Sequence, residues 1–302
     1  MNATLKVVDL FAGCGGLSLG FCHAGYDVVA AYEKWTVAAR CYRENFSHPV
    51  FEIDLSDAEK AAEHIKPYSP DVIVGGPPCQ DFSAAGARTE GSRASLTFAY
   101  AHIVSIAKPA WFAMENVGRA YASHAYAEAK NLFRSAGYGL TERILDAGRC
   151  GAPQKRKRFF CIGKLGAADN FMGKLIDERL SVRLMTVREY MGDELDVEYY
   201  YRHPRNYNRR GVFSVDEPAP TVRGVNRRVP KGYIGHAGDP IKISDSLRPL
   251  TVFERARLQT FPANFIWNAT KTDLEQLIGN AVPVKLAEFI ARSMSDYGKN
   301  LP

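Results

Sequence analysis

Short apolar segments alternate with amphipathic segments through the first half of the chain, and this alternation restricts the possible folds more than any other feature. Several apolar segments run directly into turns rich in glycine or proline, which is typical of strand ends. Strands that alternate with helices predict a mainly parallel sheet covered on both faces, so we expect an α/β fold. The expected strands are 5–10, 26–32, 71–74 and 111–114, with helices around 17–23, up to residue 45 and at 96–107.

The second half of the chain is organised differently. The stretch 198–239 is rich in tyrosine, arginine, asparagine, glycine and proline, and it sustains no helical period. Helical periodicity returns at 251–259 and again at 284–294. We therefore expect a large lobe built from both ends of the chain, with a smaller loop-rich domain inserted. The expected bounds are 1–175 for the lobe, 176–247 for the insertion and 248–302 for the return to the lobe.

The positive charge of the chain is concentrated in the expected insertion. The 302 residues include 39 lysines and arginines and 33 aspartates and glutamates, which gives a net charge of +6. Between Arg202 and Lys231 there are eight basic and two acidic residues, an excess equal to the net charge of the whole chain. A run of charge is usually a solvated surface, but its confinement to one segment favours a nucleic-acid contact.

Composition excludes several other classes of protein. No apolar run approaches the roughly 18 residues needed to cross a bilayer, and the first 25 residues lack the pattern of a secretory signal. We expect no membrane association and a cytoplasmic location. The six cysteines form no C-x-x-C pair, and no cysteine and histidine cluster has zinc-ligand spacing. We expect reduced thiols and no bound metal.

The first expected strand leads into the glycine-rich sequence D-L-F-A-G-C-G-G at residues 9–16. Glycines at such a turn let the backbone approach a ligand without side-chain obstruction, as in nucleotide-binding folds. Glu33 lies at the end of the second expected strand, where a ribose-binding carboxylate is found in such folds. Bare packing of the turn and a solvent-facing glutamate are the alternatives.

A second loop, Gly75-Gly76-Pro77-Pro78-Cys79, follows the third expected strand. Two prolines fix the backbone, so Cys79 is held at the carboxyl end of a strand, where open α/β sheets bind ligands. A packing cysteine rarely follows two prolines in a polar loop. We interpret Cys79 as a nucleophile.

These loops and four further motifs closely resemble the DNA cytosine-5 methyltransferases, over nearly the whole chain except the basic insertion. The motifs occur in the family's usual order. They are D-L-F-A-G-C-G-G at 9–16, P-P-C-Q at 77–80, E-N-V at 115–117, Q-K-R-K-R at 154–158, R-L-Q-T-F-P at 257–262 and G-N-A-V-P-V at 279–284.

The resemblance implies a catalytic chemistry for named residues. Cytosine carbon 5 is a poor nucleophile, so in this family a thiolate adds to carbon 6 and activates carbon 5; here Cys79 would form that adduct. Glu115 would hydrogen-bond ring nitrogen 3 and the exocyclic amine. Arg158 would bind the carbonyl oxygen of the base and help to position Glu115. Arg156 is expected to be a nearby contact to substrate or phosphate.

The resemblance also implies S-adenosylmethionine as the cofactor, bound in a Rossmann-like lobe. Phe11 is expected against the adenine, Glu33 at the ribose and Asp54 at the adenine amine. In several relatives an apolar or aromatic residue after the glutamate covers the adenine; here Lys34 stands there with Trp35 next, so either side chain is a candidate. Leu96 is equally compatible with the protein core. The remaining expected cofactor contacts are Gly13, Gly15, Gly16, Pro77 and Asn280.

The target carbon is buried in duplex DNA, so the target nucleotide must be flipped out and a second surface must hold the duplex. Thr221 and Val222 resemble the family's pair in the target-recognition domain. Arginine suits both phosphates and guanine, so we expect guanine beside the target cytosine. The expected DNA contacts are Gln80, Ser83, Thr221, Arg223, Arg227 and Arg228.

The sequence thus predicts a DNA cytosine-5 methyltransferase that acts on a short duplex sequence. The resemblance further suggests a bacterial or phage monomer, partnered with a restriction endonuclease that acts on the same site. Two alternatives share the fold: a transfer RNA cytosine-5 methyltransferase, because such a relative carries nearly the same motifs, and a catalytically silent DNA-binding regulator. A nicotinamide-dependent oxidoreductase would explain the glycine turn but not the Pro-Pro-Cys-Gln loop.

Overall fold

The computed structural model of the protein describes residues 4–78 and 95–299 and divides the chain into two compact units. The first unit contains Met1–Leu145, Lys157–Leu180 and Ala287–Pro302, and the second contains Asp146–Arg156 and Ser181–Leu286. The return to the first unit thus falls at residue 287 rather than at the expected 248, because residues 248–286 make their contacts within the second unit. The short segment 146–156 also belongs to the second unit, although the expected division placed it in the large lobe.

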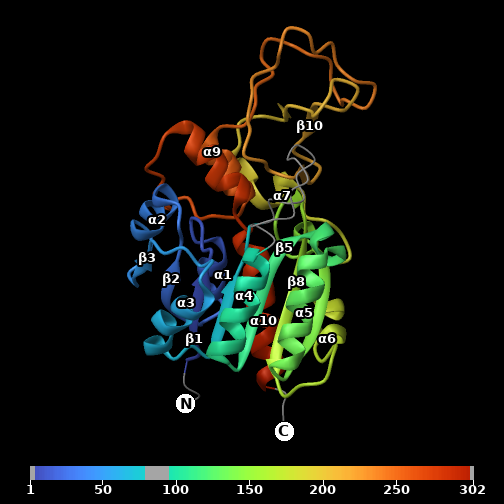
Figure 1. The fold of residues 1–302 in the computed structure, drawn as a ribbon. Coiled ribbons are helices and arrows are strands. Elements are labelled where there is room, and N and C mark those ends of the chain that lie inside the picture. The colour runs from blue at the N-terminus through green and yellow to red at the C-terminus, as the bar shows by residue number, and fades with distance from the viewer. Residues whose placement is uncertain (1–3, 79–94, 300–302) are drawn as a thin grey trace. The chain divides into compact units, whose positions relative to one another are not determined.

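The first unit contains a seven-stranded sheet with the strand order β3-β2-β1-β4-β5-β8-β6 (Figure 1). Neighbouring strands from β3 to β5 pair in parallel, and β5 pairs with β8 in antiparallel fashion. This arrangement confirms the predicted α/β fold. The strands are β1 (Lys6–Leu10), β2 (Asp27–Tyr32), β3 (Val50–Phe51), β4 (Val72–Gly75), β5 (Trp111–Val117), β6 (Tyr138–Asp146) and β8 (Lys157–Leu165).

Helices cover both faces of this sheet, with α3, α4 and α5 side by side on one face and α10 on the other (Figure 1). The main apolar core lies between the sheet and α3, α4 and α5, where side chains such as Tyr100, Phe112, Phe133 and Phe159 are fully buried. The helices are α1 (Gly16–His23), α2 (Thr36–Arg43), α3 (Ala58–Ile65), α4 (Ser95–Ala107), α5 (His124–Ser135), α6 (Gly173–Arg179) and α10 (Val284–Lys299), with short 3₁₀ turns at η1 (Lys66–Tyr68) and η3 (Gly118–Ala122).

The second unit has little regular structure, as its composition predicts. Its β9 and β10 form an antiparallel pair, its β7 and β11 form a short parallel pair, and a small aromatic and aliphatic core surrounds Tyr201, Val212, Tyr233 and Leu247. The elements are η4 (Ala147–Arg149), β7 (Gln154–Lys155), α7 (Val187–Met191), η5 (Gly192–Glu194), β9 (Tyr199–Tyr201), β10 (Val212–Ser214), β11 (Ala219–Pro220), α8 (Val252–Leu258) and α9 (Lys271–Asn280).

Two further observations apply to the described part of the chain. None of its helices combines the length and the apolar character that a membrane span requires. Within residues 4–78 and 95–299, no three histidine, cysteine or acidic side chains come together as a set of metal ligands.

Candidate active site

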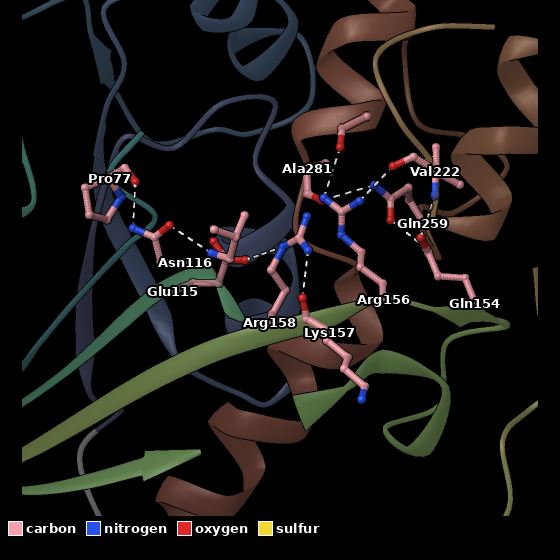
Figure 2. A network of polar contacts seen from close by, with 12 residues as sticks. Pro77, Glu115, Asn116, Gln154, Arg156, Lys157, Arg158, Val222, Gln259 and Ala281 are labelled. Atoms are coloured by element: carbon pink, nitrogen blue, oxygen red, sulfur yellow. Dashed lines mark hydrogen bonds and ion pairs between the residues drawn. The ribbon is translucent and has the colours of Figure 1, made fainter. Parts of the chain in front are cut away.

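A buried ion pair between Glu115 and Arg158 lies at the ends of two neighbouring strands of the large sheet. Glu115 is near the end of β5 and Arg158 near the start of β8, and the antiparallel register places Arg158 opposite Val117. The guanidinium Nε lies 2.8 Å from the carboxylate Oε1, and the two side chains are only 14% and 10% exposed (Figure 2). Because both charges are largely removed from water, the pair holds each side chain in one orientation.

The loop after β4 packs against this pair. Asn116 donates its side-chain amide to the carbonyl of Pro77 at 3.2 Å and accepts the backbone N–H of Val117 at 2.8 Å (Figure 2). A Cβ atom built on Gly76 would lie 3.0 Å from Glu115 Oε2, so a side chain there would crowd the carboxylate. The chain that leads to Cys79 therefore leaves the sheet beside Glu115. Cys79, Gln80 and Ser83 themselves lie outside the described residues.

Arg156 does not occupy the substrate-contacting position that the sequence suggested. Its side chain is 1% exposed, and its guanidinium donates to three backbone carbonyls of the second unit: Val222 at 2.8 Å, Gly279 at 3.0 Å and Ala281 at 2.9 Å (Figure 2). Residues two apart in a regular strand share a face, so the sequence implies similar surroundings for Arg156 and Arg158. The strand is interrupted at Arg156, which lies between β7 and β8, so the alternation of faces is not maintained from Arg156 to Arg158 in β8.

Gln154 extends the hydrogen-bond network around Arg156. Its side-chain amide donates to the Leu258 carbonyl at 2.9 Å and to Gln259 Oε1 at 2.7 Å, and its Oε1 accepts the Val222 N–H at 3.1 Å. The predicted DNA contact Thr221 lies beside these groups, where its hydroxyl donates to the Lys155 carbonyl at 2.6 Å. The first half of the Q-K-R-K-R motif therefore hydrogen-bonds Thr221 and Val222 of the expected target-recognition domain.

The carboxyl ends of β1 and β2 bring the glycine-rich turn and Glu33 together. Glu33 accepts the N–H of Gly13 at 2.8 Å through Oε2 and the N–H of Trp35 at 2.7 Å through Oε1. Burial raises the pKa of this carboxyl, and the backbone N–H groups of Trp35, Gly13 and Lys34 act in the opposite direction. Glu33 is therefore not the solvent-facing glutamate considered as an alternative, because it connects the end of β2 to the turn after β1.

The backbone of the turn after β1 adopts positive φ angles at several residues. Phe11 has φ of 58° although it is not a glycine, and Gly13 and Gly15 have φ of 57° and 93°. A Cβ atom built on Gly13 would meet nothing within 4 Å, so one side of the turn is open. Gly16 is the first residue of α1 and is buried. An open turn next to a carboxylate that retains lone pairs fits a ligand with hydroxyl donors, such as a nucleoside.

Lys34 and Trp35 differ in their surroundings. Lys34 is exposed, and its ammonium lies 2.5 Å from Asp54 Oδ2. This lysine holds the pKa of Asp54 below its usual range and occupies one of the oxygens expected to accept the adenine amine. Trp35 is half-buried and precedes the first turn of α2. The two candidates for covering the adenine therefore differ in that Lys34 is engaged with Asp54 and Trp35 is partly buried.

The remaining expected cofactor contacts lie in three places. Pro77 is buried after β4, and Leu96 is half-buried in the first turn of α4. Asn280 is an exposed residue at the end of α9. Pro77 and Leu96 belong to the first unit and Asn280 to the second.

A buried polar chain below the turn was not predicted from the sequence. Asp9 is fully buried and accepts the Ser18 hydroxyl at 2.6 Å; Tyr42 in turn donates to Ser18 at 2.6 Å and lies 2.7 Å from His48 Nε2. Burial raises the pKa of Asp9 to about 7. Asp9 is the first residue of the D-L-F-A-G-C-G-G motif, which was the only sequence signal for this chain.

The three arginines predicted to contact DNA all lie in the second unit. Arg227 and Arg228 are exposed, whereas Arg223 is half-buried and its guanidinium donates to the carbonyl of His203. Three residues near these sites were not among the expected site residues. Asn116 contacts the loop after β4, and His203 and Arg205 line a hollow together with Arg223 and Arg227. Asn116 lies in the quoted E-N-V motif and Arg205 in the basic stretch, so both had a sequence signal, whereas His203 had none.

Comparisons with known proteins agree with this geometry. The sequence model of the C-5 cytosine-specific DNA methylases matches residues 5–296. The type II methyltransferase M.HindV of Haemophilus influenzae is 54% identical over 297 residues, which is 98% of each chain. The type II methyltransferase M.HgiDI of Herpetosiphon aurantiacus is 50% identical over 294 residues, 97% of this chain and 95% of that protein.

Among solved structures, the fold is similar to that of the Dnmt2 methyltransferase of S. pombe. The TM-score is 0.77, and the alignment covers 98% of this chain and all of the other, with 22% sequence identity. This likeness supports the α/β fold assignment, and the sequence relatives above carry the family assignment.

Proposed function

Because the chain belongs to the C-5 cytosine-specific DNA methylases and methylates carbon 5 of cytosine in DNA, we propose that Cys79, Glu115 and Arg158 are its catalytic residues. The observation that carries this proposal is the buried Glu115–Arg158 pair against the loop that leads to Cys79. Glu115 on β5 and the loop that follows the adjacent β4 lie at the edge where parallel sheets bind their ligands.

In the proposed reaction the thiolate of Cys79 adds to carbon 6 of the flipped-out cytosine, and the ring gains electron density. Glu115, as the protonated carboxylic acid, donates a hydrogen bond to ring nitrogen 3, which stabilises that density, and accepts one from the exocyclic amine. Arg158 holds the carboxyl group in place and donates to the carbonyl oxygen of the base. Carbon 5 then takes the methyl group, loses its proton to a base or water, and the carbon–sulfur bond breaks to release Cys79.

We propose that the turn after β1 binds S-adenosylmethionine, which supplies the electrophilic methyl group. Glu33 would accept the ribose hydroxyls, the backbone of Gly13, Gly15 and Gly16 would surround the methionine portion, and Phe11 and Trp35 would contact the adenine. The open side of Gly13 and the position of Glu33 support this assignment. Asp54, Pro77, Leu96 and Asn280 are the further candidates for contacts to this cofactor.

We propose double-stranded DNA as the partner of the second unit, with guanine beside the target cytosine. Its exposed arginines and the fixed Thr221–Val222 backbone support this role. The proposed contacts are Gln80, Ser83, Thr221, Arg223, Arg227 and Arg228. Binding selection from a random duplex pool tests the assignment: Arg227→Ala or Arg228→Ala should change affinity or sequence preference, and a protein in which both are unchanged would contradict it.

The relatives named as type II methyltransferases support a place in a restriction–modification system. We propose that the enzyme works as a monomer in the cytoplasm and protects DNA from a restriction endonuclease that cuts the same sequence. Expression on a plasmid followed by bisulfite sequencing would reveal the modified base and its sequence context. Plasmid that remains unmodified in cells containing folded enzyme would contradict the proposal.

The decisive test of the chemistry is covalent trapping. Duplexes that carry 5-fluorocytosine at the modified position should crosslink to Cys79 in the presence of S-adenosylmethionine, because the fluorine cannot leave as a proton does. Cys79→Ser should form no crosslink and show no turnover. A crosslink that maps elsewhere would exclude Cys79, and transfer RNA offered in parallel would separate the DNA function from the RNA alternative.

A further inference from the structure

The second unit contains a hollow whose lining is basic. It has a volume of about 250 Å³ and is formed by two segments of the chain. We call it the arginine hollow; its lining residues are His203, Pro204, Arg205, Arg223, Val225 and Arg227. Three guanidinium side chains and an imidazole thus share one concave surface, and the lining contains no carboxylate.

Several other arginines of the same unit are paired with acids. Arg188 pairs with Glu198 and Asp216, Arg210 with Glu217, and Arg257 with Glu194. Arg248 and Arg255 are also paired with acids. Among the described residues, Arg205, Arg223 and Arg227 form no ion pair. Acids thus neutralise six arginines of the unit, counting Arg183 with Glu189, whereas the three arginines gathered in the hollow have no counter-charge in the described part of the chain.

The charges of the hollow lie close enough to affect one another. Burial lowers the pKa of His203, and Arg227, Arg223 and Arg202 lower it further by repulsion. Burial also lowers the pKa of Arg223, with a contribution from Arg205. The folded unit thus brings like charges together, which is electrostatically unfavourable. A bound anion would reduce this repulsion.

The backbone around the hollow is held in place by groups outside it. Arg223 donates to the carbonyl of His203, which joins the two lining segments. Arg255, paired with Glu275, donates to the carbonyl of Arg223. The Tyr201 hydroxyl lies 3.1 Å from His203 Nδ1. These contacts hold the side chains of Arg223 and His203 and the backbone of the two lining segments in place.

We propose that the arginine hollow binds phosphates of the DNA backbone rather than the edge of a base. A base edge offers neutral acceptors, which would leave the repulsion among three guanidinium groups uncompensated, whereas each phosphate carries a full negative charge. The inference rests on the proposed DNA substrate. It adds His203 and Arg205 to the contact surface and leaves Arg228, which does not line the hollow, as the arginine available for guanine.

The test compares Arg205→Ala and Arg227→Ala with the unchanged enzyme on two duplexes. One duplex carries the sequence found by bisulfite sequencing and the other a scrambled sequence of the same composition. Each variant should lose roughly ten-fold in affinity for both duplexes at low salt. The slope of log K against log salt concentration should become shallower by about 1 for each arginine removed. Both side chains are exposed, so the variants should fold.

Arg183→Ala is the matched control, since it removes one exposed charge from the same unit outside the hollow, at a residue paired with Glu189. It should leave affinity and slope unchanged. A loss confined to the cognate duplex would assign the hollow to base reading and overturn the inference, as would an unchanged slope or an equal effect of Arg183→Ala.

Neutral methylphosphonate linkages, introduced one at a time into the cognate duplex, provide a second readout. The Arg227→Ala loss should disappear at the phosphate that Arg227 contacts, and persistence of the loss at every position would also overturn the inference. Methylation of the cognate duplex by the unchanged enzyme and by Arg183→Ala tests the proposed function separately, so failure of that function and failure of this inference are distinguishable.

Discussion

Each unit of this enzyme contains a buried carboxylate–guanidinium pair, and the two pairs have different surroundings. Glu115 and Arg158 join the ends of two strands, and the second carboxylate oxygen of Glu115 faces Gly76 in the loop before Cys79. Glu275 and Arg255 join α9 to α8, with side chains 6% and 7% exposed, and Arg255 also donates to the carbonyl of Arg223.

The comparison shows that burial and pairing alone do not identify a catalytic acid. The chemistry of the two pairs is the same, and what differs is the neighbour of the carboxylate. Glu115 borders the loop that leads to the proposed nucleophile Cys79, near a strand end, where ligands bind in such sheets. Glu275 lies between helices and supports the backbone of the recognition segment. We therefore expect loss of one acid to affect the rate and loss of the other to affect stability.

The largest expected effect is a loss of stability when the pair of Glu275 on α9 and Arg255 on α8 is broken. Glu275→Gln leaves Arg255 with an unneutralised buried charge, and the free energy of unfolding should fall by about 3 to 5 kcal/mol. Urea unfolding measures this change. The double substitution Arg255→Met with Glu275→Leu should recover much of the loss, because it removes both charges. A single-variant loss below about 1 kcal/mol would show that this pair has no structural role.

Loss of the acid in the Glu115–Arg158 pair should lower the rate of methyl transfer. Glu115→Gln should raise the barrier to methyl transfer by about 3 to 4 kcal/mol, because a stabilising group at the developing charge is removed. Single-turnover methylation with saturating DNA measures the chemical step separately from any change in the free energy of unfolding. A near-normal single-turnover rate would exclude the catalytic role.

The arginines of the Q-K-R-K-R motif sharpen the same contrast. Arg156→Met removes the donors of three buried carbonyl contacts and should lower the free energy of unfolding by about 2 kcal/mol, with kcat at saturating DNA little changed. Arg158→Met should instead lower kcat. If Arg156→Met lowered kcat as much as Arg158→Met, the separation of roles would be wrong.

The prediction with the smallest effect per pH unit concerns Asp9, a buried acid that accepts the Ser18 hydroxyl. Because burial raises its pKa from 3.8 to about 7, the folded protein keeps a proton that the unfolded chain has released between these values. Stability from this group is complete below about pH 4 and is lost as the pH rises through 7, with a slope on the order of 1 kcal/mol per pH unit. Urea unfolding of Asp9→Asn should show a flatter pH dependence, and an equal slope in both proteins would contradict this assignment.

The sequence predicted the large sheet because its evidence is local. Each strand and helix of the first unit has a recognisable spacing of apolar residues in the sequence. The glycine and proline turns at 9–16 and 75–79 mark the strand ends. The boundary at residue 248 was wrong because periodicity reveals a helix but not its packing partner. Residues 251–259 were correctly expected to be helical, yet α8 makes its contacts within the second unit.

The roles within the motifs were predictable only where the residue type dictates one chemistry. Lys34 and Trp35 are adjacent and equally plausible from the sequence, and the ion pair to Asp54 distinguishes them. The eight basic residues between 202 and 231 are equivalent in composition, whereas the structure separates Arg210, which pairs with Glu217, from the arginines that line the hollow.

The sequence by itself determined the family, the order of the motifs, the parallel sheet and the identity of the candidate nucleophile, because short-range patterns and residue types carry that information. Only the tertiary structure decided that Arg255 meets Glu275, that Arg156 supports a backbone rather than the substrate, and which basic side chains share a surface. Those relations depend on contacts between residues tens of positions apart, and a single sequence does not record them.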